Sequence, residues 1–378
     1  MYIVKVSKKI LAIFGTRPEA IKLSLLIKAL IKDNQFDIKV CVTAQHRSML
    51  DDVLDLFEIK PDYDLNVMQA GSSLNDTAAK ILSGLNNILE TFNPNIVMVQ
   101  GDTTTVAIAA LASYYKQIPI AHVEAGLRTG NIYSPWPEEG NRKMTTTITK
   151  YHFAPTSSAQ NNLLKENIDP SSIFITGNTV IDSLFWVQNK IKNDIALRNK
   201  LEKEFSFIDP TKRIILVTGH RRESFGEGFE RICKALLEIA NKNKDVQIIY
   251  PVHLNPNVKE PVNKLLKEVK NISLIEPQNY IKFNYLMSKS YIILTDSGGI
   301  QEEAPSLGKP VLVMRDVTER PEAVEAGTVK LVGTDINKII NSVSELLNNK
   351  NEYKKMSLSH NPYGDGKACG RIVEILAK

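Results

Sequence analysis

Short runs of hydrophobic residues alternate with longer segments of helical spacing along nearly the whole chain. Each run has the length of a buried strand, and enough residues follow it for a helix. Strands that alternate with helices in this way predict parallel sheets built from strand–helix–strand units. The predicted strands are Ile10–Phe14, Ile38–Val42, Ile96–Val99, Ile118–Val123, Ile214–Val217, Val246–Val252, Tyr291–Leu294 and Val311–Met314.

The strand series restarts in the second half of the chain, at Ile214. Two such series predict two α/β domains, each with a doubly wound parallel sheet. The join is expected between Ile175 and Lys212, where the charged, helix-rich stretch Gln188–Lys203 is the best candidate for the connecting region.

The composition is that of a soluble globular protein. Of the 378 residues, 43% are hydrophobic and 24% are charged, which excludes disordered and coiled-coil classes. Lys and Arg exceed Asp and Glu by 47 to 42 without a long run of one sign, so we expect no nucleic-acid partner. Three widely separated cysteines and the lack of an apolar run of about 18–20 residues favour a cytoplasmic protein without a membrane partner.

Two cations follow the first predicted strand. Pro18 is typical of the first residue of a helix, which places Arg17 at the start of that helix and Lys22 about one turn along it. Cations beside a helix N-terminus suit a diphosphate, because the helix dipole and the free amides also attract anions. The alternative is an ordinary strand–helix turn with a solvated arginine.

Three carboxylates are predicted to meet at one edge of the first sheet. Asp102 and Glu124 follow buried strands, and Glu138 begins a helix after a long loop. Each of them alone is well explained as a helix cap or a surface group. Together they favour a functional site, because gathered like charges are unfavourable unless they have a task.

The second half has a similar edge. His220 follows the strand that ends at Val217, and Asp296-Ser297-Gly298-Gly299 follows the strand that ends at Leu294. Glycine amides at the start of a helix can approach a phosphate closely. A structural histidine and a tight turn are the alternatives.

Several motifs are missing. There is no GxxxxGK[ST] and no complete dinucleotide fingerprint, and the six histidines lack metal-ligand spacing. We therefore expect neither a cofactor nor a bound catalytic metal.

Taken together, these segments closely resemble the non-hydrolysing UDP-N-acetylglucosamine 2-epimerases, nearly from end to end. The matching segments are Phe14-Gly15-Thr16-Arg17-Pro18-Glu19-Ala20, Ala44-Gln45-His46-Arg47, Gly101-Asp102-Thr103-Thr104-Thr105, His122-Val123-Glu124-Ala125-Gly126-Leu127-Arg128, Pro135-Trp136-Pro137-Glu138-Glu139, Asp296-Ser297-Gly298-Gly299-Ile300-Gln301-Glu302-Glu303-Ala304-Pro305, Thr318-Glu319-Arg320-Pro321-Glu322 and Asn361-Pro362-Tyr363-Gly364-Asp365-Gly366.

The resemblance implies a glycosyltransferase-B-like fold, in which two Rossmann-like domains with doubly wound parallel sheets face a central cleft. The N-terminal domain would be residues 1–177 together with the returning C-terminal helix 364–378, and the UDP-binding domain residues 178–363. It also implies a homodimer and the interconversion of UDP-N-acetylglucosamine and UDP-N-acetylmannosamine, in support of surface polysaccharide synthesis.

The resemblance also assigns roles to individual residues. Asp102, Glu124 and Glu138 would be the acid–base carboxylates, and His220 would contact the phosphate or the leaving oxygen. The substrate-binding set would be Arg17, Lys22, Gln278, Phe283, Ser297, Gly298, Gly299, Glu303 and Arg320.

One feature departs from some bacterial members of the family. They bind a second, activating UDP-N-acetylglucosamine through a Gln-His pair that matches Gln45 and His46, and through an Arg-Gln pair. The second pair has no match here, where the chain reads Gln69-Ala70-Gly71. Activation by substrate is therefore in doubt.

Three rival functions have to be weighed. A hydrolysing epimerase, which releases UDP and N-acetylmannosamine, would use much the same residues. A glycosyltransferase of the same fold would not need the carboxylates of the first domain, because simple transfer exchanges no proton at carbon 2. A silent nucleotide-sugar sensor would not need so complete a set of charged residues.

Overall fold

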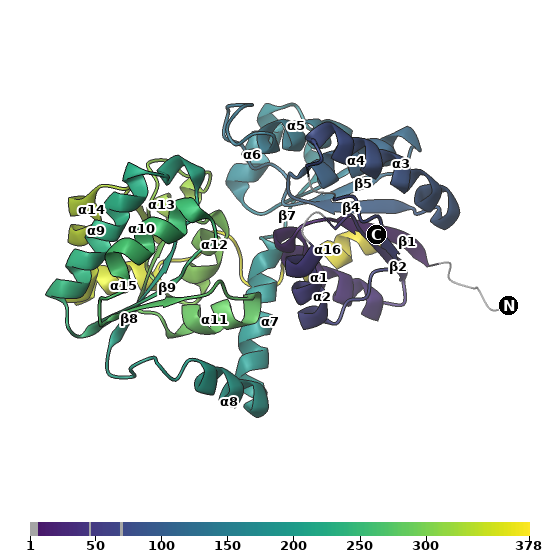
Figure 1. The fold of residues 1–378 in the computed structure, drawn as a ribbon. Coiled ribbons are helices and arrows are strands. Elements are labelled where there is room, and N and C mark those ends of the chain that lie inside the picture. The colour runs from purple at the N-terminus through teal and green to yellow at the C-terminus, as the bar shows by residue number, and fades with distance from the viewer. Residues whose placement is uncertain (1–6, 45–46, 69–70) are drawn as a thin grey trace. The chain divides into compact units, whose positions relative to one another are not determined.

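The computed structural model describes residues 7–44, 47–68 and 71–378. The chain divides into two compact units (Figure 1). Unit 1 is Met1–Ser183 together with Tyr363–Lys378, and unit 2 is Leu184–Pro362. The division lies within the join expected from the sequence, and the stretch Gln188–Lys203 belongs to unit 2.

Unit 1 contains a seven-stranded sheet in the order β3-β2-β1-β4-β5-β6-β7, with every neighbouring pair parallel. Its strands are β1 (Lys8–Phe14), β2 (Phe36–Val42), β3 (Tyr63–Asp64), β4 (Ile96–Gln100), β5 (Ile120–Val123), β6 (Tyr151–Ala154) and β7 (Ile173–Ile175). The residues of β4 and β5 are buried throughout, as the continuous apolar runs predict.

Helices cover both faces of this sheet. The α3, α4 and α5 helices lie on one face and α1, α2 and α16 on the other (Figure 1). The helices of unit 1 are α1 (Arg17–Lys32), α2 (Arg47–Phe57), α3 (Leu74–Phe92), α4 (Thr104–Tyr115), α5 (Glu138–Ile148), α6 (Ser157–Lys165), the 3-10 turn η1 (Pro170–Ser172) and α16 (Ala368–Ala377), and α7 (Thr179–Asn193) crosses the division between the units.

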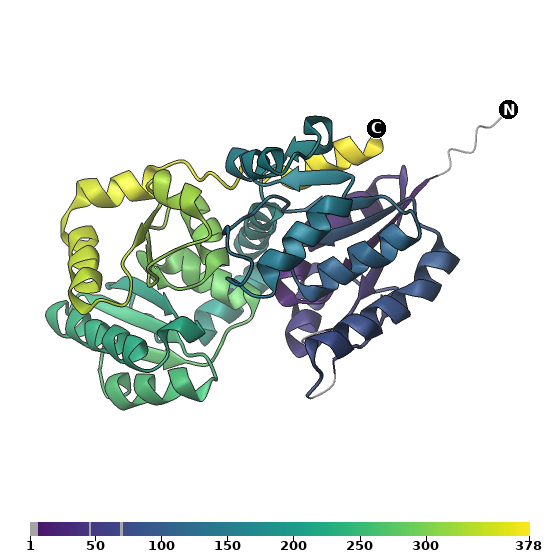
Figure 2. The same ribbon diagram turned by 90° about the horizontal axis from the view of Figure 1, so that it is seen from above.

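The C-terminal helix α16 belongs to unit 1 (Figure 2). The buried carboxylate of Asp182 accepts hydrogen bonds from the amides of Ala368 and Cys369, at 3.2 and 2.9 Å. Lys8 donates to the carbonyl of Leu376 at 2.6 Å. Both ends of the helix are therefore bonded to elements far away in the sequence.

Unit 2 contains a six-stranded parallel sheet in the order β10-β9-β8-β11-β12-β13. Its strands are β8 (Arg213–Thr218), β9 (Val246–Pro251), β10 (Ile272–Ile275), β11 (Ile292–Thr295), β12 (Val311–Val313) and β13 (Val329–Leu331). Its helices are α8 (Ile195–Glu204), η2 (Arg222–Ser224), α9 (Glu227–Lys242), α10 (Pro256–Leu266), α11 (Tyr280–Lys289), α12 (Gly298–Ser306), α13 (Pro321–Glu325), α14 (Ile336–Asn348) and α15 (Lys350–Leu358). The apolar face of α9 packs between α10 and α14 over the sheet core.

Both sheets have the topology that creates a ligand site. Chain order reverses between β1 and β4 in unit 1 and between β8 and β11 in unit 2, where these strands lie side by side. Ligands of such sheets bind beyond the carboxyl ends of the strands at this reversal. The loops that follow these four strands are therefore the first place to look for function.

The eight strands predicted from the sequence are confirmed, although some predicted ends lie just outside the observed strands. These are Ile118 and Pro119 before β5, Val252 after β9, Tyr291 before β11 and Met314 after β12. The structure adds β3, β6, β7, β10 and β13, which have two to four residues each. Runs of this length with polar members, such as the Val-Lys-Leu of β13, carry too little periodicity to be recognised.

Candidate active site

The carboxyl ends of β4 and β5 bring two of the three predicted carboxylates together. Glu124 follows β5 and Asp102 follows β4, its neighbour in the sheet. A Cβ built on Gly101 would lie 3.8 Å from Oε2 of Glu124. The side chain of Glu124 thus packs against the turn that carries Asp102.

Glu124 is buried in a cluster of hydrogen-bond donors. Its Oε1 accepts hydrogen bonds from Nζ of Lys22 at 2.5 Å and Nδ2 of Asn178 at 2.9 Å. Its Oε2 accepts a hydrogen bond from the side-chain amide of Gln100. The backbone of Glu124 is left-handed, with φ of 67°. A buried carboxylate with partners on both oxygens is fixed in position.

Asp102 is held by a buried arginine of α5. Arg142 donates from Nη2 to Oδ2 of Asp102, and the amide of Asn141 donates to the backbone carbonyl of Asp102 at 2.9 Å. Nη1 of Arg142 lies 3.1 Å from Oε2 of the fully buried Glu139. The start of α5 is therefore tied to the loop after β4.

The third predicted carboxylate, Glu138, differs from the other two. It is the first residue of α5 and is only half-buried, and its side chain has no hydrogen bond or ion pair with the residues that the structure describes. Its neighbour Glu139 instead accepts the amides of Thr129 and Gly130, at 3.1 and 3.2 Å, and so anchors the long loop that precedes the helix.

The first strand–helix turn is shaped by Glu19. Its Oε2 accepts the amides of Gly15 and Thr16 at 2.9 and 2.7 Å, and its Oε1 accepts the hydroxyl of Thr103 at 2.6 Å. Burial raises the pKa of Glu19, and these hydrogen bonds oppose the rise. The hydrogen bonds to Glu19 fix the start of α1, where Arg17 is half-buried.

In unit 2, His220 follows β8 and faces the carboxylate of Asp296, which follows the neighbouring β11. Its Nδ1 lies 3.3 Å from Oδ1 of Asp296, and its ring stacks on His253 with centroids 5.5 Å apart. Burial lowers the pKa of His220, and Arg221 and His253 lower it further, whereas Asp296 raises it. The side chain is 44% exposed, so one edge of the ring is open.

The Ser297-Gly298-Gly299 segment begins α12, as the sequence predicts. A Cβ on Gly298 would come within 3.1 Å of Oε1 of Glu319 and 3.2 Å of Cζ of Arg320, whereas a Cβ on Gly299 would meet no atom within 4 Å. Gly298 therefore packs on the loop before α13, and the backbone at Gly299 is open to a ligand.

Arg320 is nearly buried between two carboxylates. Its Nε donates to Oε1 of Glu302 at 2.8 Å, and its Nη1 lies 3.2 Å from Oε1 of Glu319. Burial raises the pKa of Glu319, but Arg320, Arg315 and Arg221 together lower it to about 2. This part of the site therefore combines an ionised carboxylate with three cations.

The remaining residues of the predicted set lie in or beside α11 and α12. Oε1 of Glu303 accepts the hydroxyl of Tyr280 at 2.5 Å. Gln278 bonds the carbonyl of Glu276 at 2.6 Å and precedes α11, and Phe283 lies half-buried within that helix.

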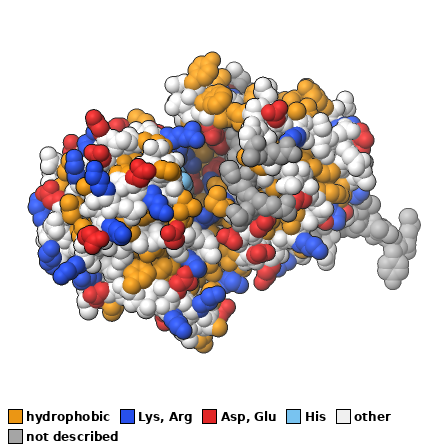
Figure 3. Space-filling model, viewed as in Figure 1, with side chains coloured by type: hydrophobic (Ala, Val, Ile, Leu, Met, Phe, Trp, Pro, Cys, Tyr) orange, Lys and Arg blue, Asp and Glu red, His pale blue; other side chains and the backbone are white. Residues whose placement is uncertain are grey.

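Gln45 and His46, expected at a second nucleotide-sugar site, lie outside the described residues. Among the residues described, no group of three or more His, Cys, Asp or Glu could hold a metal ion. No helix within the described ranges is long and apolar enough to cross a bilayer. On the face shown in Figure 3, Lys and Arg side chains are mixed with Asp and Glu over the described surface of unit 2.

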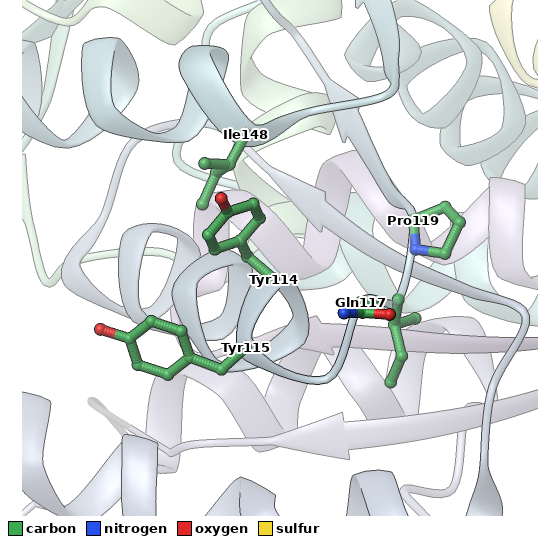
Figure 4. Close-up of a pocket in the computed structure, with 6 residues that line it drawn as sticks. Tyr114, Tyr115, Gln117, Pro119 and Ile148 are labelled. Carbon is green, nitrogen blue, oxygen red and sulfur yellow. The ribbon is translucent and has the colours of Figure 1, made fainter.

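A surface cavity of about 580 Å³ lies elsewhere on unit 1, at the end of α4 (Figure 4). It is lined by Tyr114, Tyr115, Gln117, Ile118, Pro119 and Ile148. None of the predicted site residues lines it.

Several residues that hold the site together were assigned no role of their own from the sequence. Arg142, Gln100, Asn178, Asp296 and Tyr280 each bond or face a predicted site residue. A signal was available for two of them, because Gln100 and Asp296 are polar residues at the ends of apolar strands. Arg142 and Asn178 carry no such signal.

Comparison with known proteins gives one consistent picture. A sequence model of the family described as UDP-N-acetylglucosamine 2-epimerase matches residues 28–377. The UDP-N-acetylglucosamine 2-epimerase of Escherichia coli strain K12 is 61% identical over 368 residues, which cover 97% of this chain and 98% of the relative.

Solved structures agree with the sequence comparison. The Neisseria meningitidis UDP-GlcNAc 2-epimerase bound to UDP-GlcNAc is 54% identical and superposes with a TM-score of 0.93, covering 97% of this chain and 99% of the other. The Methanocaldococcus jannaschii enzyme in complex with UDP-GlcNAc and UDP is 37% identical, with a TM-score of 0.82 and coverage of 97% and 99%. The two parallel α/β units thus form a glycosyltransferase-B-like fold. The chain belongs to the UDP-N-acetylglucosamine 2-epimerase family, and its activity is that of an isomerase.

Proposed function

We propose that the chain interconverts UDP-N-acetylglucosamine and UDP-N-acetylmannosamine by eliminating and re-adding UDP, without hydrolysis. The observation that carries this proposal is the pair of neighbouring strand ends in unit 1. There Glu124 and Asp102 are each held by a buried cation, Lys22 and Arg142. The bound UDP-GlcNAc of the Neisseria relative supports the substrate.

The chemistry of the substrate requires such groups. The hydrogen on carbon 2 has no adjacent carbonyl, so direct deprotonation is too costly. When the bond from carbon 1 to the phosphate oxygen breaks, its electron pair leaves with UDP and positive charge develops at carbon 1. This charge acidifies the hydrogen on carbon 2, and loss of that proton gives a 2-acetamidoglucal. Protonation from the opposite face and re-addition of UDP give the epimer.

In this proposal the carboxylates of unit 1 move the protons. Glu124 and Asp102 are fixed in position by their hydrogen-bond donors. A base that removes a carbon-bound hydrogen has to be held in position in this way. Glu138 would be the third acid–base group, and its side chain has no partner among the described residues. A positioned acid–base group contributes about 10²–10⁴-fold to the rate.

The residues of unit 2 would bind UDP. His220 and Arg320 would contact the diphosphate, and Ser297 together with the amides of Gly298 and Gly299 at the start of α12 would hold it. Glu303 would accept the ribose hydroxyls, with Gln278 and Phe283 at the uracil. Lys22 belongs to the same substrate-binding set, and its ammonium group also pairs with Glu124.

We also propose that the enzyme is a homodimer in the cytoplasm that supplies bacterial surface polysaccharide synthesis. Tyr114 and Tyr115, which are 55% and 65% exposed on α4 of unit 1, are apolar enough for a subunit contact. Light scattering at micromolar concentration should give about twice the chain mass of 42.3 kDa. A mass of one chain would contradict the dimer.

The hydrolysing reaction is the alternative, and the products distinguish the two. Purified protein is incubated with UDP-N-acetylglucosamine, and the mixture is separated by anion exchange. We expect UDP-N-acetylmannosamine in equilibrium with the substrate, with no accumulation of UDP. Accumulation of UDP together with free N-acetylmannosamine would show hydrolysis.

A further inference from the structure

Asp296 is a buried carboxylate that joins two strand ends in unit 2. It follows β11 and is 2% exposed. Its Oδ2 accepts the amides of His220 and Arg221, at 2.7 and 2.8 Å, and so fixes the loop that follows β8. The direction in which His220 leaves the backbone is therefore set by Asp296.

The second oxygen of this carboxylate faces the ring of His220. Oδ1 lies 3.3 Å from Nδ1 and is buried without a hydrogen-bond partner among the described residues. A buried carboxylate oxygen without a donor is costly. A small rotation of the ring would let Nδ1–H donate to it. The carboxylate thus favours a proton on Nδ1.

The other side of the ring is free for a ligand. His253 stacks on the ring face with an interplanar angle of 21°, which restrains rotation of the imidazole. Nε2 of His220 has no hydrogen bond with the residues that the structure describes, and the side chain is 44% exposed. The charged or titratable groups that face the ring are Asp296, Arg221 and His253.

We propose that Asp296 is a positioning residue that keeps His220 able to carry a proton on Nε2 for the leaving diphosphate. When the ring is protonated beside the bound diphosphate, Nδ1–H donates to Asp296 and Nε2–H is offered to the oxygen that joins carbon 1 to the phosphate. When the bond at carbon 1 breaks, that oxygen takes the electron pair and the proton of Nε2, and both return on re-addition. This inference rests on the role proposed above for His220.

The wild-type protein provides the first test. Ring nitrogen shifts of ¹⁵N-histidine-labelled protein report the tautomer and the titration of each histidine, and the His220→Gln variant identifies the signal. We expect neutral His220 to hold its proton on Nδ1. We also expect its pKa to rise when UDP binds, because the diphosphate adds negative charge. A neutral Nε2–H tautomer in the free protein would overturn the inference.

The Asp296→Asn variant provides the second test. The side-chain oxygen of the asparagine can still accept hydrogen bonds from the backbone amides of His220 and Arg221. Its NH₂ group, however, replaces the oxygen that faces Nδ1 of His220. We expect kcat to fall about 10²-fold or more, with the KM little changed. The pKa of His220 with UDP bound should fall, and the alkaline limb of the kcat profile should move to lower pH with it.

The His220→Gln variant separates this inference from the proposed function. If it loses activity and Asp296→Asn does not, the inference is wrong and the proposed role of His220 stands. If His220→Gln keeps full activity, the proposed role fails and the inference fails with it. If both single variants lose activity and the double variant is no worse than His220→Gln alone, Asp296 acts through His220.

Discussion

Lys22 of α1 and Glu124 after β5 form an ion pair in which both side chains are buried, with 10% and 5% exposed. The two residues are 102 positions apart in the sequence. Their contact connects the helix after β1 with the strand end that carries the central carboxylate of the candidate site. Stability and activity should therefore depend on the same pair.

The Lys22→Met variant should be less stable and less active than the wild type. Removing one partner of a buried ion pair typically costs about 3–5 kcal/mol, because the other charge is left uncompensated. Turnover should fall as well, since Glu124 loses one of its fixed donors. Urea unfolding and steady-state kinetics measure the two effects.

The control for this variant is Lys28→Met, which breaks the pair with the exposed Glu58. It should cost less than about 1 kcal/mol. The double variant Lys22→Met with Glu124→Gln should recover part of the lost stability and none of the activity. Equal stability of Lys22→Met and the wild type would show that the pair is unimportant.

Two adjacent glutamates should behave in opposite ways. Glu138→Gln should lower kcat about 10²–10⁴-fold and leave folding and UDP affinity unchanged, because the side chain has no partner among the described residues. Glu139→Gln should instead destabilise unit 1, because the buried Glu139 accepts two amides of the preceding loop and pairs with Arg142. Calorimetry together with kinetics on both variants checks the contrast. A fully active Glu138→Gln would remove that residue from the mechanism.

The phosphate-binding role of the α12 start can be tested at Gly299. The Gly299→Ala variant should fold at least as stably as the wild type, because the added Cβ meets no atom within 4 Å and alanine favours a helix by about 1 kcal/mol. It should nevertheless weaken UDP binding about tenfold or more, if the backbone approaches the diphosphate. Isothermal titration with UDP measures this. Wild-type affinity for UDP in a stable Gly299→Ala variant would contradict a phosphate-binding role of the α12 start.

Buried His122 should make stability depend on pH. Its Nε2 donates to the carbonyl of Gly101 at 2.7 Å, and burial lowers its pKa to about 4. The unfolded chain binds this proton near pH 6.5, so the stability linked to His122 is complete above pH 6.5 and is lost as the pH falls toward 4. The loss amounts to about 3 kcal/mol.

The His122→Gln variant, which can keep the hydrogen bond to Gly101, should flatten this pH dependence in urea unfolding between pH 7 and 4. The matched control is His360→Gln, at an exposed histidine, and it should show the same pH dependence of stability as the wild type. If His122→Gln and the wild type have the same slope, His122 already carries its proton in the folded protein.

The sequence predicted the parts of the site that lie just beyond strands of continuous apolar residues. Asp102, Glu124 and His220 stand out because each lies one to three positions beyond a run of buried apolar residues, and parallel strands bring such positions to one edge. The start of α12 at Gly298 could be predicted in the same way. These features depend only on local pattern and on the rule of parallel sheets.

The partners of these residues could not be predicted. Arg142 reaches Asp102 because α5 turns that face toward the loop after β4, and Asn178 reaches Glu124 from beyond β7, a strand of three residues. Such contacts depend on strand order and helix rotation, which are set by packing over the whole unit. The site therefore contains more cations and amides close to its carboxylates than the sequence indicated.

The most direct test of the account is proton NMR of the purified enzyme with UDP-N-acetylglucosamine in D₂O, without added cofactor or metal. We expect that UDP-N-acetylmannosamine forms with deuterium at carbon 2, and that the substrate formed in the reverse reaction gains deuterium there while UDP stays attached at equilibrium. An epimer that keeps its original hydrogen at carbon 2 would contradict proton transfer by the carboxylates of unit 1.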